Sequence, residues 1–286
     1  MDCIFSVDVE DWFHILDIES SPDMSQWSSL PGRVEENFVK LLDIFSEYNV
    51  TVTCFFLGWV AEKHPHLLRR AADLGHEIAS HGYSHKLVYQ MTPEEFMSDA
   101  AMSKDLIENI IGMPVLGYRA SGFSVTRATP WFFDKLIDAG YRYDSSVFPA
   151  RRGHGGLAST NYAPYIVERN GKGIVEFPIT VKEVFGRGSC FFGGGYLRLF
   201  PYFIVKRMAR AVQQEGRPVV FYIHPREIDP HHPRLPMSCK RALKSYVNLK
   251  STESKIRKIL VDFKMSTFRG FLNDNSNLLQ PEKNSK

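Results

Sequence analysis

The sequence contains few cysteines and no long apolar segment. Its four cysteines among 286 residues form no CxxC pair; they are Cys3, Cys54, Cys190 and Cys239. This spacing argues against a zinc knuckle or a disulfide framework and predicts reduced, mostly buried thiols. No stretch reaches the ~18 consecutive apolar residues of a membrane-spanning helix, and the N-terminus has no basic region typical of a signal peptide. We therefore expect a cytoplasmic protein with no transmembrane segment; peripheral contact with a membrane stays open.

The sequence also lacks a strong charge of either sign and lacks the common nucleotide-binding motifs. The formal net charge is +3, which is too mild to predict a nucleic-acid partner. No G-x-G-x-x-G follows the first predicted strand, and "GGGYLRLF" at 193–200 has no G-K-[ST]. Neither a dinucleotide-binding fold nor a phosphate-binding P-loop is therefore supported.

Apolar runs alternate with amphipathic helical patterns along most of the chain. Strands are predicted at 3–7, 51–57, 76–80, 115–119, 141–145 and 218–224. Helices are predicted at 33–49, 92–112, 127–140 and 200–216, several of them ending at glycine. Strand–helix alternation is typical of parallel βαβ units, and about six to eight units suit a barrel better than an open sheet.

Two regions depart from this alternation. The glycine-rich stretch 148–196 predicts long loops with a short hairpin formed by about 163–168 and 173–180. The polar end of the chain, 273–286, predicts a flexible tail. We therefore predict a single α/β domain over residues 1–272, built as a barrel.

Five predicted strands deliver a charged or titratable residue at the same end. These residues are Asp8, Glu10 and Asp11 after the first strand, His81 and His85 after the third, and Arg119, Asp144 and His224 at three others. In parallel α/β barrels the active site lies at the carboxyl ends of the strands, which form the mouth of the barrel. The pattern predicts one shared polar site at this mouth.

The two histidines of "HGYSH" stand four residues apart, which fits a metal-ligand pair or two unrelated residues on one helical turn. Gly82 and Ser84 are poor in helix interiors, so a loop after the strand is favoured. Two imidazoles and one carboxylate are a common ligand set for a catalytic Zn²⁺, and "DVED" at 8–11 offers three carboxylates. One of these acids can bind a metal while another takes a proton from water.

Arg119 and His224 each have two readings. Arg119 is either an ordinary surface arginine or a group that fixes a carboxylate base through a paired hydrogen bond. His224 follows six largely apolar residues, which fits a buried structural histidine or a general acid near neutral pH.

Taken in order, the motifs resemble those of the polysaccharide deacetylases, the NodB-homology enzymes of carbohydrate esterase family 4. "VDVED" resembles the branch of the family whose first motif has spaced acids, and "HGYSH" resembles the second motif. "GYRASGFS", "DSSVFP" and "YIHPRE" are similar to the third, fourth and fifth. The resemblance covers the chain from Cys3 to about Phe268, and it implies a distorted (β/α)7–8 barrel.

The resemblance also implies roles. It makes Asp8 the catalytic base, oriented by Arg119, and His224 the general acid. The implied ligands of a divalent ion, above all Zn²⁺, are Glu10, His81 and His85. Aspartate is usual in the family where this chain has Glu10, which leaves Asp11 as a rival ligand.

The fourth motif departs more strongly, because "DSSVFP" lacks the second Asp and the Trp that many members have. Asp144 is the implied catalytic residue of this motif. Both Asp144 and Glu227 remain candidates for the group that tunes His224.

The implied activity is removal of an N-acetyl group from an amino sugar in a glycan or glycan precursor. The segment from about 190 to 270 is similar to a cytoplasmic subgroup linked to the biosynthesis of exopolysaccharides and surface glycans. A cytoplasmic location favours a sugar on a nucleotide or lipid-pyrophosphate carrier over mature peptidoglycan. Two alternatives stay open: a metal-free, allantoinase-like C–N hydrolase on the same fold, and a non-catalytic glycan-binding module.

Side chains for substrate binding are also suggested by position. Five arginines in predicted mouth-side loops either contact phosphate or are simply solvated; they are Arg151, Arg152, Arg198, Arg226 and Arg234. "GGGYLRLF" is expected to shape a sugar-binding wall with Tyr196. Trp12, Phe13 and Phe148 either stack on sugar or pack in the core.

Overall fold

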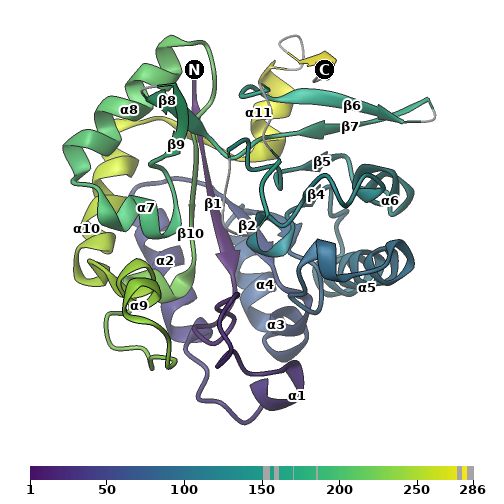
Figure 1. The fold of residues 1–286 in the computed structure, drawn as a ribbon, viewed down its shortest axis with the longest axis horizontal. Helices are drawn as coiled ribbons and strands as arrows, with labels where there is room; N and C mark the ends of the chain where they lie inside the picture. The colour runs from purple at the N-terminus through teal and green to yellow at the C-terminus, as the bar shows by residue number, and fades with distance from the viewer. Residues whose placement is uncertain (151–154, 158–160, 170, 185, 276–278, 282–286) are drawn as a thin grey trace.

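The computed structural model describes residues 1–150, 155–157, 161–169, 171–184, 186–275 and 279–281. A curved sheet runs through its centre in the strand order β10-β1-β2-β3-β4-β5-β7-β6-β12 (Figure 1). The parallel strands that position the site are β1 (Cys3–Val9), β2 (Thr53–Phe56), β3 (Glu77–Ser80), β4 (Gly117–Tyr118), β5 (Tyr143–Asp144) and β10 (Val220–Ile223). The others are β6 (Tyr165–Arg169), β7 (Lys172–Glu176), β8 (Val181–Val184), β9 (Arg187–Cys190), β11 (Met265–Ser266) and β12 (Gln280–Pro281).

Helices pack around this sheet (Figure 1). The longer ones are α2 (Val34–Glu47), α4 (Pro65–Asp73), α5 (Pro93–Ile111), α8 (Tyr202–Gln214) and α10 (Leu249–Asp262). Shorter ones are α1 (Met24–Trp27), α3 (Gly58–Lys63), α6 (Phe132–Asp138), α7 (Gly194–Leu199), α9 (Cys239–Tyr246) and α11 (Phe268–Asn275). Three single turns are η1 (Val88–Gln90), η2 (Ser121–Phe123) and η3 (Pro225–Ile228). The predicted α/β class is confirmed. The sheet forms a curled half-barrel, where the sequence predicted a distorted barrel.

Helix boundaries follow the local sequence signals. Helix α5 begins with a capping box, in which the Thr92 hydroxyl accepts a hydrogen bond from the Glu95 amide and the Glu95 carboxylate accepts one from the Thr92 amide. The helix ends at Gly112, whose φ of 69° lies in the left-handed region that glycine tolerates. Helix α2 buries the predicted apolar face, and it packs on the sheet through Val34, Phe38, Leu41, Leu42 and Phe45.

The sheet core explains why the predicted strands read as continuous apolar runs. Every residue of β1, β2, β3 and β10 is buried, because the sheet packs against side chains on both faces. Strand β1 lies between β2 and β10, and all three are parallel. The carboxyl ends of these strands therefore meet at one edge, as the site prediction requires.

The glycine-rich region and the end of the chain are more ordered than the sequence predicts. The predicted hairpin is confirmed as the antiparallel pair β6–β7, and a second hairpin, β8–β9, follows it. Helix α11 extends to Asn275, and β12 pairs with β6, so part of the predicted flexible tail is built into the fold. Polar composition failed to reveal this because β12 is held by backbone pairing.

Two predictions about absent features can be compared with the structure. The four cysteines are free thiols, three of them buried, as predicted. Within the described ranges, no helix combines the length and the apolar character needed to cross a membrane.

Candidate functional site

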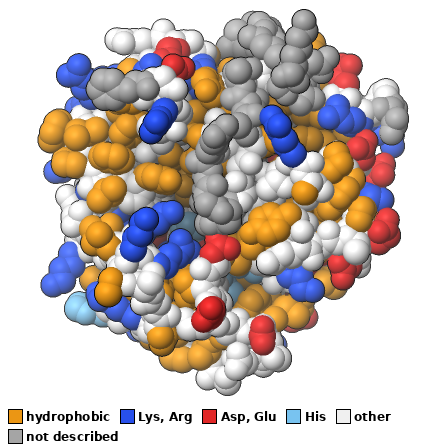
Figure 2. Space-filling view, viewed as in Figure 1, with side chains coloured by type: hydrophobic (Ala, Val, Ile, Leu, Met, Phe, Trp, Pro, Cys, Tyr) orange, Lys and Arg blue, Asp and Glu red, His pale blue; other side chains and the backbone are white. Residues whose placement is uncertain are grey.

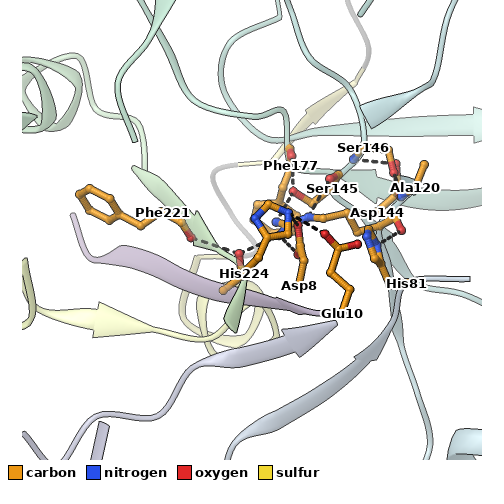
Figure 3. A network of polar contacts seen from close by, with 12 residues as sticks. Asp8, Glu10, His81, Ala120, Asp144, Ser145, Ser146, Phe177, Phe221 and His224 are labelled. Atoms are coloured by element: carbon orange, nitrogen blue, oxygen red, sulfur yellow. Dashed lines mark hydrogen bonds and ion pairs between the residues drawn. The ribbon is translucent and has the colours of Figure 1, made fainter. Parts of the chain in front are cut away.

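A cleft opens at the carboxyl ends of β1, β3 and β10, with about 830 Å³ of empty space that is continuous with solvent. Five of the predicted site residues line it: Asp8, Glu10, His81, His85 and His224. Figure 3 shows four of these side chains, Asp8, Glu10, His81 and His224, converging from the ends of three strands, β1, β3 and β10. The strand-end prediction therefore brings together residues that lie more than 200 positions apart in the sequence.

Glu10, His81 and His85 form a compact buried group. One ligand atom from each lies within 4.8 Å of the other two, and Glu10 Oε2 is 2.5 Å from His85 Nε2. His81 Nδ1 is 2.7 Å from the Arg119 carbonyl oxygen. Since a carbonyl only accepts, Nδ1 carries the proton and Nε2 keeps its lone pair for a metal. Two imidazoles and one carboxylate in a buried setting fit Zn²⁺ or a similar divalent ion.

The segment with both histidines is a loop, as Gly82 and Ser84 predicted. Gly82 and His85 have φ values of 72° and 56°, which no helix allows. The Asp99 carboxylate on α5 accepts hydrogen bonds from the Tyr83 and Ser84 amides, at 2.8 and 2.9 Å. Helix α5 thus holds the loop in the shape that directs both imidazoles to Glu10.

Asp8 is held by Arg119, which is fully buried. Arg119 Nη1 donates to Asp8 Oδ1 at 2.6 Å and to the Ser6 hydroxyl at 2.8 Å. Its Nε and Nη2 donate to the carbonyl and hydroxyl oxygens of Ser145, and its guanidinium lies 4.1 Å from the centre of the Phe55 ring. These contacts fix Asp8 Oδ1 and orient Asp8 Oδ2 toward His224, 3.9 Å from Nε2.

His224 completes the group from the end of β10. Its Nε2 is 3.3 Å from Glu10 Oε1, and its Nδ1 is 3.6 Å from Glu227 Oε2. Burial lowers the pKa of His224 to about 4, although the carboxylates of Glu10 and Asp8 act in the opposite direction. Burial would raise the pKa of Glu10, but the charges of His85 and His224 outweigh it and keep this pKa low.

Asp144 does not line the cleft. It accepts hydrogen bonds from the hydroxyl and amide of Ser146, at 2.6 and 3.2 Å, and Ser146 Oγ accepts from the Ala120 amide (Figure 3). It lies opposite Glu176 in the sheet, and burial raises the pKa of both carboxyls. Asp144 thus braces the segment after Arg119, and Glu227 is the acid that faces His224.

Asp11, the rival third ligand, turns away from the histidines. Its carboxylate accepts hydrogen bonds from the amides of Trp12, Arg33 and Val34, at 2.7, 2.8 and 3.1 Å. The amides of Arg33 and Val34 lie at the start of α2, where a carboxylate satisfies unpaired N–H groups. The geometry therefore favours Glu10 as the third ligand.

Replacing Asp11 by Ala is expected to destabilise the fold and leave metal binding intact. The variant loses hydrogen bonds to three amides, two of them at the start of α2, so the free energy of unfolding should fall by ~2 kcal/mol. Urea denaturation measures this change, and metal analysis of the folded variant checks the second part. A folded Asp11→Ala protein without metal would contradict the assignment of Glu10.

His14 is among the cleft residues that the sequence did not predict. His14 is buried, lines the cleft, and lies with its ring centre 5.4 Å from that of His85. Its Nδ1 accepts a hydrogen bond from the Asp11 amide at 2.9 Å, so Nε2 carries the ring proton. Burial holds its pKa well below the usual value, which keeps the ring neutral. Its position just after the acids of the first strand was the available signal.

The predicted substrate-binding side chains divide by burial. Trp12, Phe13 and Phe148 are buried and do not line the cleft, so core packing is the correct reading. Tyr196 lines the cleft. Gly195 beside it also lines the cleft, and a Cβ there would lie 2.9 Å from the Lys244 carbonyl oxygen.

The five predicted arginines differ in whether they line the cleft. Arg226 lines the cleft, whereas Arg234 lies outside it with its guanidinium 5.0 Å from the centre of the Tyr246 ring. Arg198 touches the cleft but is buried and forms an ion pair with Glu227. The remaining two, Arg151 and Arg152, lie outside the described residues.

Comparisons with known proteins match two consecutive parts of the chain to family models. A family model of the polysaccharide deacetylases matches residues 26–143, and a model of a domain of unknown function, DUF3473, matches residues 145–273. A peptidoglycan deacetylase of Helicobacter pylori is 27% identical over 166 residues, which are 57% of this chain and 52% of that protein. The chain therefore aligns with only about half the length of that relative.

Solved structures share the fold. A Mycobacterium smegmatis protein assigned as a polysaccharide deacetylase has a TM-score of 0.67 at 19% identity, covering 99% of this chain and 93% of that one. Puue allantoinase has a TM-score of 0.61 at 17% identity, covering 96% and 90%. The predicted fold is thereby confirmed.

Proposed function

We propose that the chain is a metal-dependent hydrolase that removes an N-acetyl group from an amino sugar, because residues 26–143 match the family model of the polysaccharide deacetylases. The main support for this proposal is that a possible metal-ligand set and a possible acid–base pair lie together in one cleft. Glu10, His81 and His85 form a metal-ligand set, and Asp8 and His224 lie beside it as a base and an acid.

Glu10, His81 and His85 would hold the divalent ion, with Zn²⁺ favoured by the two imidazoles. Bound there, the ion supplies Lewis-acid chemistry, polarising the acetyl carbonyl and acidifying water. The Arg119 carbonyl keeps His81 in the tautomer that leaves Nε2 available.

Asp8 is proposed to take a proton from the attacking water. Its Oδ1 is engaged by Arg119, so Oδ2 is the oxygen that can receive the proton. The buried guanidinium pairs with Asp8 and holds its carboxylate in one orientation. Arg119 acts through Asp8 and is a positioning residue in this mechanism.

His224 is proposed to give a proton to the departing sugar amine. Glu227 lies behind its Nδ1 at 3.6 Å, on the side of the ring that faces away from Glu10 and Asp8. Glu227 is in turn paired with buried Arg198, so the ring is supported by a fixed group. We therefore propose the tuning role for Glu227 and a bracing role for Asp144.

The allantoinase-like alternative shares the fold but has no use for a metal-ligand set. A buried Glu–His–His group with a fixed histidine tautomer is costly without a ligand, because buried polar atoms need partners. A glycan-binding module has no use for a base and an acid on either side of that group. Both alternatives are therefore weaker.

The substrate is proposed to be an N-acetylated glycan or glycan precursor of surface-polysaccharide synthesis, with the sugar on a nucleotide or lipid-pyrophosphate carrier. The match of residues 145–273 to a separate model supports a substrate-adapted C-terminal segment. The cytoplasmic location stays a prediction.

The test is acetate release from a panel of N-acetylated nucleotide sugars, lipid-linked glycans and chitin oligosaccharides. We expect release from at least one member, loss of release with a chelator, and recovery when Zn²⁺ is added back. Activity that survives complete metal removal would support the metal-free alternative instead. Binding without any release across the panel would support the glycan-binding module.

A further inference from the structure

A cluster of basic side chains lies across the cleft from the catalytic residues. Arg226 from η3 and Arg241 and Lys244 from α9 line the cleft, and we call these three residues the basic wall. Figure 2 shows Lys and Arg side chains gathered at the edge of the hollow, on the side where α9 lies. The wall belongs to the segment matched by the domain of unknown function, not to the deacetylase match.

Two members of the wall have no carboxylate partner in the described part of the chain. The hydrogen bonds of Arg226 and Arg241 go to backbone carbonyls, those of Ser245 at 3.5 Å and Leu16 at 2.6 Å. Arg241 Nε is buried and has no hydrogen-bond partner among the described residues. Both side chains are half-buried, and guanidinium charge partly removed from water is unfavourable without an anion, so the two are suited to an anionic ligand.

Basic side chains elsewhere on the molecule behave differently. Arg33, Lys206 and Arg257 each form an ion pair with a carboxylate of a neighbouring element. These pairs are what a surface basic residue ordinarily makes when an acid is near. The basic wall is therefore not explained as a set of structural ion pairs.

The acids nearest to the wall are already engaged. Glu10 is bound by His85 and faces His224, and Glu227 is paired with Arg198. The positive charges of Arg226 and Arg241 are thus available to a ligand in the cleft. An anion held there would lie beside the group that the catalytic residues act on.

Arg198 fixes the wall in place. Its guanidinium donates to the carbonyl oxygens of Lys244, Ser245 and Val247, at 2.9, 3.0 and 3.2 Å. Because Arg198 also pairs with Glu227, the end of α9 is tied to the loop that carries His224. The wall and the proposed acid therefore keep a constant separation, as a binding site for one molecule requires.

We propose that the basic wall binds an oxyanion, a phosphate or a carboxylate, on the same molecule whose N-acetyl group is hydrolysed. The substrate class is then an acidic N-acetylated sugar, not a neutral polymer such as chitin. This inference rests on the proposed deacetylase function. Two arginines and a lysine around one site match the donor arrangement that such anions need.

The test compares three N-acetylated substrates: N-acetylglucosamine 1-phosphate, a disaccharide of N-acetylglucosamine and glucuronic acid, and neutral N,N′-diacetylchitobiose. We expect wild-type kcat/KM to be about tenfold or more higher for at least one anionic substrate. The double variant Arg241→Gln/Lys244→Gln should lose that preference through a higher KM. The substrate that shows the preference identifies the anion as phosphate or carboxylate.

Lys240→Gln is the matched control, because Lys240 is an exposed residue one turn before Lys244 on α9 and does not line the cleft. It should keep the wild-type preference. A wild-type enzyme without preference, or a double variant that keeps it, would overturn the proposal.

Calorimetric binding of the same three compounds separates this inference from the proposed function. If no compound releases acetate, the proposed deacetylase function is wrong. The ratio of the Kd for an anionic compound to the Kd for the neutral compound then tests whether the basic wall binds an anion. A ratio that is low in the wild type and rises in the double variant supports the wall, and an unchanged ratio rejects it.

Discussion

Replacing Asp8 by Asn is expected to remove most of the catalytic activity while the metal stays bound. An amide has the shape of the carboxylate and still accepts a hydrogen bond from Arg119, but it cannot take a proton from water. General-base catalysis contributes about 10²- to 10⁴-fold, so kcat should fall by that factor. Steady-state acetate release and metal analysis on the same preparation measure both parts.

This variant also loses stability, because the buried charge of Arg119 no longer faces a carboxylate. Assays should therefore be run well below the unfolding temperature of the variant. Asp11→Ala is a suitable control, since it destabilises a neighbouring position that does not line the cleft. Wild-type turnover in Asp8→Asn would rule out Asp8 as the base.

Replacing Glu10 or His81 by Ala is expected to abolish metal binding. The wild-type protein should hold about one ion per chain, as a site with three protein ligands does. Each variant removes one of three ligands from a buried group, and the two remaining ligands should retain close to no metal after dialysis. Elemental analysis gives the metal content, and acetate release should be lost with it.

The same measurement separates the two acids that follow the first strand. Glu10→Ala should lose the metal, whereas Asp11→Ala should retain it and show only reduced stability. The reverse result would make Asp11 the ligand and would require the loop after β1 to rearrange. If His81→Ala kept the wild-type metal content, the whole proposed ligand set would be contradicted.

Much of the site could be predicted because parallel strands end at the same edge. That rule brought Asp8, Glu10, His81, His85 and His224 together without knowledge of the strand order. The choice between Glu10 and Asp11 was harder, since both follow the same strand. Alternation along the strand places Asp8 and Glu10 on one side, and the structure places Asp11 on the amides of α2.

An arginine in a predicted mouth-side loop was not a reliable sign of a ligand-binding residue. Arg198 and Arg226 both stand in predicted mouth-side segments, yet Arg198 is buried against Glu227 and only Arg226 belongs to the basic wall. Arg241 and Lys244 went unnoticed because α9 has no pattern that distinguishes its cleft-facing side chains from its solvated ones. Which basic residue meets a carboxylate depends on long-range packing that local sequence does not encode.

The sequence also failed to predict some strands, because their extent depends on backbone hydrogen bonds between distant segments. The β8–β9 hairpin and β12 are short, and their residues lack a clear alternating pattern. Strands β4 and β5 have only two paired residues each, fewer than their apolar runs suggested. Side-chain patterns predict burial well, but they predict the extent of hydrogen bonding poorly.

The position of β1 between β2 and β10 has a consequence for how the protein is made. Ser6 on β1 donates to the carbonyl of Phe221 on β10, a contact between residues 215 positions apart. During synthesis at about 5–20 residues per second, one edge of β1 stays unpaired for roughly 10–40 s. A nascent chain in that interval exposes an apolar strand edge, which is a template for aggregation. Active protein can therefore form only after nearly the whole chain has left the ribosome, and folding dominated by such distant contacts is slow.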